Sequence, residues 1–342
     1  MEDFVFKRIK LILLLGMVFS FAIADEYVGE EIAFKLTNPD LLTGASSSCG
    51  GSFFSAGANA ISVNPALTAG EQRVMLNISY TSLFNPSNED SSMGAGAQLG
   101  LLIPTRWGVF SGIVDGIFCH LKPLDLDNTV ELSLGFSKDI TEKLFAGMSL
   151  NSGFRWGETN MWALDLNLGF MYNFGRVGFM ENFRLGGALL NVGKPYTLGL
   201  PGICTPRVGV AATLFSVAKE NVAGGFSADL TAPQCMNLVF DVGLQLRVAK
   251  IITVKSSWQF DMAETISDNR NLFPSVGITV NLNINTKDNQ FMAEKGWQQS
   301  EIATSGAWQQ IYQDIHCVSA GAAINLGMKD VDAPEIILWG DE

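Results

Sequence analysis

Histidine is the residue type that most limits the catalytic chemistry open to this chain. The 342 residues include only two histidines, His120 and His316. Hydrolysis by a serine nucleophile needs a base within hydrogen-bond reach of the hydroxyl, and the sequence alone cannot place either histidine beside a serine. The glycine pair Gly50 and Gly51 lacks the strand-to-helix setting of a phosphate-binding loop. We predict that the protein is not an enzyme and has no cofactor.

Cysteine is more frequent, but its spacing does not indicate a metal site. The chain has no C-x-x-C pair, and the two histidines add little to a possible ligand set. An odd number of cysteines in an exported chain cannot all pair internally, so we expect no disulfide scaffold. We predict no metal and expect most cysteines to be small packing residues. The five are Cys49, Cys119, Cys204, Cys235 and Cys317.

Basic residues could support a different chemistry, the binding of an anionic group. Arg184, Arg207 and Lys255 each lie on the polar side of a segment in which apolar and polar residues alternate. Both guanidinium and ammonium groups bind carboxylates. We therefore predict these three residues as candidate contacts for a ligand carboxylate. The alternative is that they are solvated, or paired with carboxylates on the same sides, such as Asp165 and Asp229.

The segment 161–173 indicates which elements must position these side chains. Apolar and polar residues alternate through it with the period of two that is typical of a β-strand. It is long enough for a tilted strand to cross the hydrocarbon layer of a bilayer, which takes roughly 9–11 residues. The large apolar residues all fall on one side: Trp162, Leu164, Leu166, Leu168, Phe170 and Tyr172.

The same pattern recurs through most of the chain and predicts thirteen strands. Bacterial outer-membrane barrels usually have an even number of strands. We therefore expect a fourteenth strand between Lys287 and Gln313, where the sequence has no clear period. The thirteen segments are 74–81, 94–103, 107–118, 130–137, 144–153, 161–173, 183–190, 207–214, 222–230, 237–247, 251–260, 274–285 and 317–326.

These strands favour a closed barrel over a sandwich. In lipid every backbone donor and acceptor must be paired within the protein, so an all-strand membrane protein must close. Short connections near 104, 138–142 and 248–250 also alternate with longer ones, as barrel turns and loops do. We predict an all-β, transmembrane antiparallel β-barrel of about 14 strands. Two packed soluble β domains are the alternative.

The two ends of the chain differ from this middle part. Lys7, Arg8 and Lys10 precede a short apolar run that ends in Ala22-Ile23-Ala24, so we predict a cleaved signal peptide over 1–24, with a membrane anchor as the alternative. Residues 25–72 are rich in small residues and do not alternate. The predicted barrel spans 73–328, and 329–342 form a C-terminal tail. The formal net charge of −12 argues against a nucleic-acid partner.

The segment that precedes the first strand carries a family resemblance. Gly51-Ser52-Phe53-Phe54-Ser55-Ala56-Gly57 is followed by a run that ends in Asn64-Pro65-Ala66. This pattern resembles the start of the FadL/TodX-type family of outer-membrane transporters for long-chain fatty acids and other hydrophobic compounds. The nearest likeness is to the spirochaete branch, and residues 188–193 are similar to a strand end of the related PorV-like barrels.

The resemblance implies a site and a mechanism. In that family an N-terminal hatch lies inside a barrel of fourteen strands, and a kink in the third strand opens the wall sideways. It therefore implies a hatch formed by residues 25–72 that includes Phe53, Phe54, Asn64, Pro65 and Ala66. The corresponding kink would involve Gly112, Asp115 and Gly116. Glycine allows a strand to bulge, so these residues could interrupt the pairing of the strand. The alternative is that these glycines only make room for large neighbours.

These expectations combine into one hypothesis. The protein is a transporter in the bacterial cell outer membrane that takes up long-chain fatty acids or other hydrophobic small molecules through a hatch-gated barrel. The rival is a non-transporting scaffold barrel that binds a partner protein, as PorV-like barrels do. An open, water-filled porin is a third reading, against which the small-residue segment argues. The chain also departs from many such barrels because its C-terminal residue is not aromatic; a tail follows the last predicted strand. Ligand identity and oligomeric state are not predicted.

Overall fold

A computed structural model describes most of the chain between Leu36 and Gly327. The described residues are 36–43, 47–54, 56–86, 93–119, 128–157, 160–194, 204–217, 221–235, 237–266, 273–285, 297, 299–311 and 315–327. The predicted signal peptide (1–24) and C-terminal tail (329–342) lie outside these ranges, as do His120 and residues 25–35. The division of the chain into domains therefore stays a prediction.

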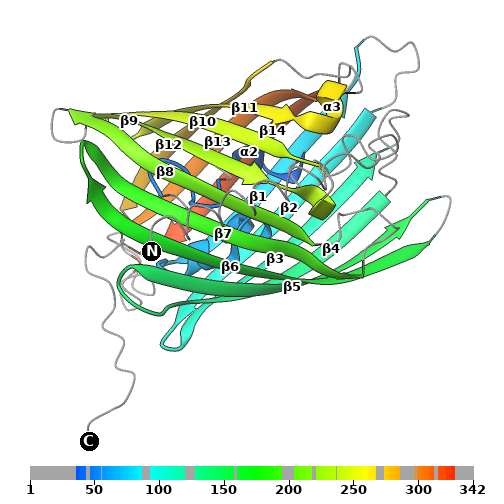
Figure 1. The fold of residues 1–342 in the computed structure, drawn as a ribbon, viewed down its shortest axis with the longest axis horizontal. Helices are drawn as coiled ribbons and strands as arrows, with labels where there is room; N and C mark the ends of the chain where they lie inside the picture. The colour runs from blue at the N-terminus through cyan, green and yellow to red at the C-terminus, as the bar shows by residue number, and fades with distance from the viewer. Residues whose placement is uncertain are drawn as a thin grey trace, which may run out of the picture.

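Fourteen antiparallel strands form a closed barrel (Figure 1). Each strand pairs with its neighbours in sequence, and β1 closes the ring by pairing with β14, with Val74 opposite Leu326 and Phe84 opposite His316. The strands are β1 (Val74–Phe84), β2 (Met93–Thr105), β3 (Gly108–Cys119), β4 (Asn128–Asp139), β5 (Leu144–Trp156), β6 (Met161–Val177), β7 (Met180–Lys194), β8 (Thr205–Val217), β9 (Val222–Thr231), β10 (Val239–Val248), β11 (Ile252–Asp261), β12 (Ser275–Asn285), β13 (Gln299–Ile311) and β14 (Ile315–Leu326).

The predicted all-β barrel and its strand number are confirmed. The strand expected between Lys287 and Gln313 is β13, which pairs with both β12 and β14. Its sequence shows no clear alternation because only Ile302 and Trp308 are large apolar residues on the side that faces outward. The remaining outward positions of this strand are polar or glycine.

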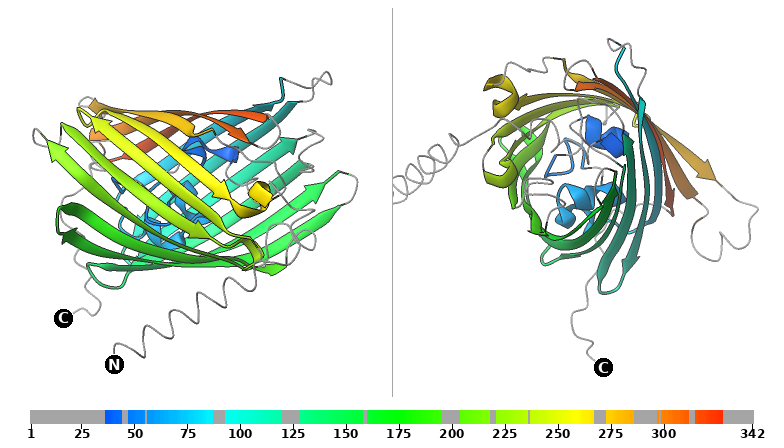
Figure 2. Two further views of the ribbon diagram at one scale, coloured as in Figure 1. Left: turned by 45° about the horizontal axis from the view of Figure 1, so that its top comes forward. Right: turned by 90° about the vertical axis from the view of Figure 1, so that its right-hand side faces the viewer.

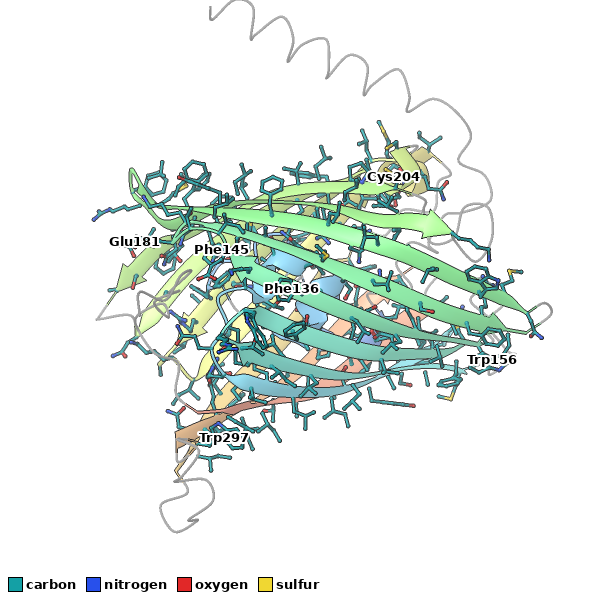
Figure 3. The ribbon with its side chains drawn as sticks, turned by 90° about the horizontal axis from the view of Figure 1, so that it is seen from below. Phe136, Phe145, Trp156, Glu181, Cys204 and Trp297 are labelled. Atoms are coloured by element: carbon teal, nitrogen blue, oxygen red, sulfur yellow. The ribbon has the colours of Figure 1, made fainter. Side chains whose placement is uncertain are left out.

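The outer surface of the barrel is apolar, and the inner surface is mixed. In β6, Leu164, Leu168 and Phe170 are exposed, whereas Asp165 and Asn167 between them are buried. Figure 3 shows side chains projecting from the outside of the wall along its whole length. Among the described helices, none is long and apolar enough to cross a membrane. In a closed barrel, an apolar outer band of this kind is the surface that contacts lipid.

The segment before β1 lies inside the barrel. It contains α2 (Pro39–Leu42), η2 (Ala58–Ser62) and η3 (Pro65–Thr68). The right-hand view of Figure 2 looks along the barrel and shows these blue elements within the ring of strands. We call the described residues between 36 and 72 the plug. Two other short helices, η4 (Pro233–Cys235) and α3 (Met262–Ile266), follow β9 and β11.

The buried apolar core lies between the plug and the wall. Leu36 and Leu42 pack in a cluster with wall residues of β1, β3, β13 and β14. Ala58 and Ile61 pack in a second cluster against β1, β2 and β3, and Leu67 packs in a third with Met171 of β6. The apolar residues of the plug therefore complete a core together with inward-facing apolar residues of the wall, whose other large apolar residues face outward.

The pairing of β3 is continuous, which bears on the predicted kink. Gly112, Asp115 and Gly116 pair without a register shift with β2 on one side and β4 on the other. The register shifts lie instead between β6 and β7, β7 and β8, and β8 and β9. A β-carbon on Gly112 would come 3.4 Å from Leu134, which is an ordinary van der Waals contact, so the neighbouring side chain does not require glycine at this position. A lateral opening at β3 stays a prediction.

Candidate functional site

Asn64 joins the plug to itself and to the wall. Its Oδ1 accepts a hydrogen bond from the Ala66 N–H at 3.0 Å and so caps η3, while Pro65 occupies the first turn, where its missing N–H costs nothing. Its Nδ2 donates to the Ser48 carbonyl at 2.7 Å and to the Phe170 carbonyl of β6 at 2.9 Å. The predicted Asn-Pro-Ala residues are all buried.

Two glycines of the wall allow η3 to approach this closely. A β-carbon on Gly147 of β5 would lie 2.5 Å from the carbonyl carbon of Pro65, and one on Gly169 of β6 would overlap the Asn64 side chain. Neither glycine has a positive φ, so their role here is to make room rather than to allow an unusual backbone conformation. The plug therefore docks closely on both strands, through the backbone of Pro65 on β5 and through the side chain of Asn64 on β6.

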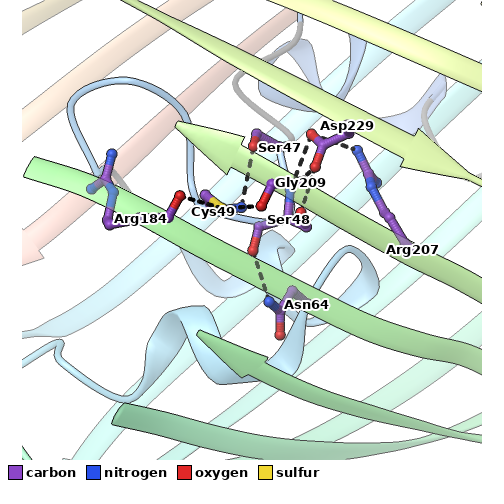
Figure 4. A network of polar contacts seen from close by, with 8 residues as sticks. All are labelled: Ser47, Ser48, Cys49, Asn64, Arg184, Arg207, Gly209 and Asp229. Atoms are coloured by element: carbon purple, nitrogen blue, oxygen red, sulfur yellow. Dashed lines mark hydrogen bonds and ion pairs between the residues drawn. The ribbon is translucent and has the colours of Figure 1, made fainter. Parts of the chain in front are cut away.

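Asp229 of β9 holds a second part of the plug (Figure 4). Its Oδ1 accepts a hydrogen bond from the Ser48 N–H at 3.1 Å and another, short one from the Ser48 hydroxyl. Its Oδ2 forms an ion pair with Nη2 of Arg207 at 3.4 Å, and both side chains are buried. Next to Ser48, the Cys49 thiol donates to the Gly209 carbonyl at 3.1 Å. Burial, followed by the charge of Asp229, raises the pKa of Cys49 to about 12, so this thiol stays protonated.

Lys255 and Arg184 hold two further parts of the plug. The ammonium of Lys255 in β11 forms an ion pair of 2.5 Å with Asp40 in α2. In β7, Nη2 of Arg184 donates to the carbonyls of Gly51 and Ser52, the second at 3.0 Å. The three basic residues predicted as ligand contacts therefore all lie at the plug. Lys255 and Arg184 contact it directly, whereas Arg207 pairs with Asp229, which contacts the plug. Their contact with a ligand carboxylate stays a prediction.

The two predicted plug phenylalanines each lie beneath an arginine. The guanidinium carbon of Arg184 lies 4.9 Å from the ring centroid of Phe54, and that of Arg247 lies 4.5 Å from the ring centroid of Phe53. Such cation–π contacts are worth about 0.5–2 kcal/mol, more when they are desolvated. Phe54 also has a φ of 48°, a region that residues other than glycine rarely adopt. The aromatic pair is therefore held in a defined position between two cations.

Several residues of this interface were not singled out by the sequence. Asn38 donates to Gln98 at 2.8 Å, Gln98 donates to Asp115 at 2.8 Å, and the Ser52 N–H donates to Gln245 at 3.1 Å. Asp115 is therefore buried and hydrogen-bonded within the barrel. Alternation in the strands could identify these side chains as inward-facing, but no sequence signal indicated which part of the plug each one would contact.

Two of the cavities between the described residues of the plug and the wall are sizeable. One has a volume of about 290 Å³ and is lined by the plug and by β1 and β10 to β14. The other has a volume of about 240 Å³ and is lined by the plug and by β5, β6 and β7. Phe53 and Phe54 line both, so this pair separates the two spaces.

Metal and nucleophilic chemistry find little support in the described residues. Within them, no group of three or more His, Cys, Asp and Glu side chains could hold a metal ion. His316 stacks between Phe84 and Trp308, with ring centroids 5.6 and 5.9 Å away. None of the five cysteines forms a disulfide, although the Cys235 thiol contacts the Cys204 carbonyl at 3.8 Å.

Comparison with known proteins finds relatives by structure only. No protein-family model matches the chain, and no curated protein sequence matches it. A solved structure described as a deletion mutant of the TodX monoaromatic hydrocarbon channel superposes with a TM-score of 0.51 at 11% identity, covering 86% of this chain and 99% of the other. The Pseudomonas putida toluene transporter TodX gives 0.49 at 10% identity, covering 85% of this chain and 98% of that one. A Pseudomonas aeruginosa FadL homologue gives 0.46 at 11% identity, with 85% and 97% covered. At such identities the likeness concerns the fold, and the chain is similar to outer-membrane channels in its fourteen-stranded barrel.

Proposed function

We propose that this protein is an outer-membrane channel that takes up hydrophobic small molecules, long-chain fatty acids among them, and that the plug gates it. The apolar outer surface supports a place in a membrane, and the fold shared with a monoaromatic hydrocarbon channel supports the outer membrane of a bacterium. Export would use the predicted signal peptide. A position in the spirochaete branch of the family is a further part of this proposal, resting on the sequence resemblance alone.

The observation that carries the proposal is the way the plug is attached. It shares no β-ladder with the wall. Its described polar contacts with the wall are side-chain hydrogen bonds and ion pairs, such as those of Asn64, Ser48 and Asp40. These contacts and the apolar clusters between the plug and the wall lie outside the β-ladders that close the ring, so they can break while the barrel stays intact. A segment held in this way can act as a gate.

The cavities support a route for a ligand past the plug. Together they surround Phe53 and Phe54, and a shift of this aromatic pair would join them. A hydrophobic ligand that enters such spaces gains roughly 0.8 kcal/mol per CH₂ group removed from water. Release into the membrane through the wall at Gly112, Asp115 and Gly116 stays part of the proposal, although it would require the continuous pairing of β3 to open.

Uptake by whole cells tests this function. We would express the chain in a bacterial host that lacks its own uptake system for long-chain fatty acids and measure uptake of radiolabelled oleate and toluene. The proposal expects saturable uptake of at least one compound above that of cells with an empty vector. Uptake no higher than the control, with the barrel present and folded in the outer membrane, would contradict it. Co-purification of a stoichiometric protein partner in that case would support the scaffold instead.

A further inference from the structure

The smaller cavity lies at the end of the barrel where β5 and β7 begin, which we call the short-turn end. Its apolar lining comes from Phe53 and Phe54 of the plug, Phe145 of β5 and Met171 of β6. Asn173 and Asn182 add neutral polar groups. Arg184 is the only charged group among the described residues of the lining. A cavity with this lining suits a ligand that has an aromatic or aliphatic body and one polar end.

Arg184 is a buried cation without an acidic partner in the described part of the chain. Its side chain is 2% exposed, and no carboxylate of the described residues lies within ion-pair distance. Two neutral carbonyls accept from Nη2, while Nε has no hydrogen-bond partner. Buried charges in proteins are usually paired because an isolated one is costly. Arg207 and Lys255 follow this rule, since each pairs with an aspartate.

We propose that this cavity is a binding site for a small carboxylate-bearing amphiphile, such as an aryl alkanoic acid, whose carboxylate supplies the missing counter-charge to Arg184. The apolar body would lie against the phenylalanines and Met171. The volume of about 240 Å³ is below the range of roughly 300–1,000 Å³ usual for drug-sized ligands, which fits a small acid or the head of a longer one. This proposal rests on the proposed function in one respect: the ligand of the site would be one of the transported compounds.

Binding at this site would also act on the plug. The guanidinium of Arg184 makes two kinds of contact with the plug. Its Nη2 donates to the carbonyls of Gly51 and Ser52, and its central carbon lies over the ring of Phe54. A carboxylate accepts a stronger, charge-assisted hydrogen bond than a carbonyl does, often from two donors of one guanidinium. A carboxylate that takes Nη2 as well as the unpartnered Nε therefore competes with the plug for Arg184. Occupation of the cavity would loosen the turn that carries Phe53 and Phe54, at the boundary between the two cavities.

Calorimetric titration of the full-length barrel in a neutral detergent tests the site. The probes are 3-phenylpropionate and its neutral counterpart 3-phenylpropan-1-ol, which differ at the polar end. We expect the carboxylate to bind at least about tenfold more tightly than the alcohol, because hydrogen bonds to charged groups are the stronger kind. Equal affinity for the two probes, or no binding of either, would overturn the proposal.

Three variants test whether a preference for the carboxylate probe depends on Arg184. Arg184→Met removes the charge at similar volume and should abolish the preference, while Arg184→Lys keeps the charge and should retain part of it. Arg247→Met is the matched control, because Arg247 lies over Phe53 and lines the other cavity. It should keep the preference. If the preference survives in Arg184→Met, or is lost in Arg247→Met, the carboxylate does not bind at Arg184 and the proposal is wrong. Strand content measured by circular dichroism checks that each variant is folded.

The titration and the uptake experiment can fail separately. Carboxylate selectivity that depends on Arg184, in a protein that moves neither oleate nor toluene, would retain the site and remove the transport function. Uptake without carboxylate selectivity would retain the function and remove the site. The two proposals are therefore distinguished by which of the two measurements gives the expected result.

Discussion

Asp229 of β9 accepts hydrogen bonds from both the backbone N–H and the hydroxyl of Ser48, a plug residue 181 positions earlier in the chain. The same carboxylate pairs with Arg207 of β8 at 3.4 Å (Figure 4). The Asp229 carboxylate therefore has two roles. It compensates the charge of the buried Arg207, and it holds the plug turn next to Cys49.

Asp229→Ala should destabilise the folded protein strongly. The substitution leaves Arg207 buried without this carboxylate and removes the acceptor of two Ser48 bonds. Breaking a buried ion pair by deleting one partner typically costs about 3–5 kcal/mol. Equilibrium unfolding in urea, followed by tryptophan fluorescence, measures the change in the free energy of unfolding. The double variant Arg207→Met with Asp229→Leu should lose less than the single one. A loss of about 0.5 kcal/mol or less, as is usual for surface substitutions, would contradict this role.

Asn64→Ala should loosen η3 while the barrel stays assembled. The variant loses a helix cap, worth typically about 1 kcal/mol, and the bonds to the carbonyls of Ser48 and Phe170. We expect backbone amides of η3 to exchange with deuterium faster by about tenfold, while those of the wall strands do not change. Mass spectrometry of deuterated peptides gives both rates. Ser62→Ala is the control, since its hydroxyl bonds only to Asn59 within the plug, at 2.8 Å. Equal exchange in the two variants would remove Asn64 from the anchoring role.

Gly147→Ala should detach η3 from β5 by steric conflict. The added β-carbon would meet backbone atoms of Pro65 at 2.5 and 2.6 Å, contacts that no side-chain rotation can relieve. The accessibility of a cysteine introduced at Thr68, measured by its labelling rate with a maleimide, should rise severalfold. Gly306→Ala in β13 is the matched control, because its β-carbon would come no closer than 3.8 Å to another group. Labelling that is as slow in Gly147→Ala as in this control would show that the close approach does not hold the plug.

Leu150→Arg should reveal which surface faces lipid. Leu150 lies in the middle of β5 and is half exposed on the outside of the wall. A basic residue at mid-membrane on the lipid side of a barrel costs about 2–4 kcal/mol, against about 0–1 kcal/mol near the interface. Ile140→Arg, in the turn after β4, is therefore the control. Folding equilibrium in lipid vesicles measures both. Equal costs at the two positions would contradict a lipid-facing outer wall.

The alternation of residues predicted most of the fold because each strand has one lipid-facing and one lumen-facing side. Segments such as 161–173 carry that information within a few residues. β13 was located only through the even strand number, since its outward side has just Ile302 and Trp308 as large apolar residues. The register shifts of β6, β7 and β8 were not foreseen, because a bulge depends on two paired strands and alternation describes one strand at a time.

The site could be predicted only in part, for a similar reason. Alternation placed Arg184, Arg207 and Lys255 on the inward side, where the structure has them. It could not indicate that Asp40 and Ser48 would lie opposite Lys255 and Asp229, since the plug has no period that relates its residues to the wall. The resemblance identified Asn64-Pro65-Ala66, but the glycines that admit η3 became recognisable only with the strands in register.

In the proposed channel, a hydrophobic compound passes only when the plug moves. Thr68 of η3 and Ser137 of β4 have their hydroxyl oxygens 2.7 Å apart, which suits replacement of both by cysteines that form a disulfide. The matched control joins two wall strands through Ser257 and Ser275, whose hydroxyl oxygens are 2.5 Å apart. The decisive measurement is uptake of radiolabelled oleate by cells that carry Thr68→Cys with Ser137→Cys, before and after reduction. A gated channel predicts that uptake is blocked while the disulfide is intact, returns on reduction, and is unaffected in the Ser257→Cys with Ser275→Cys control. Full uptake through the oxidised plug tether would contradict the gate.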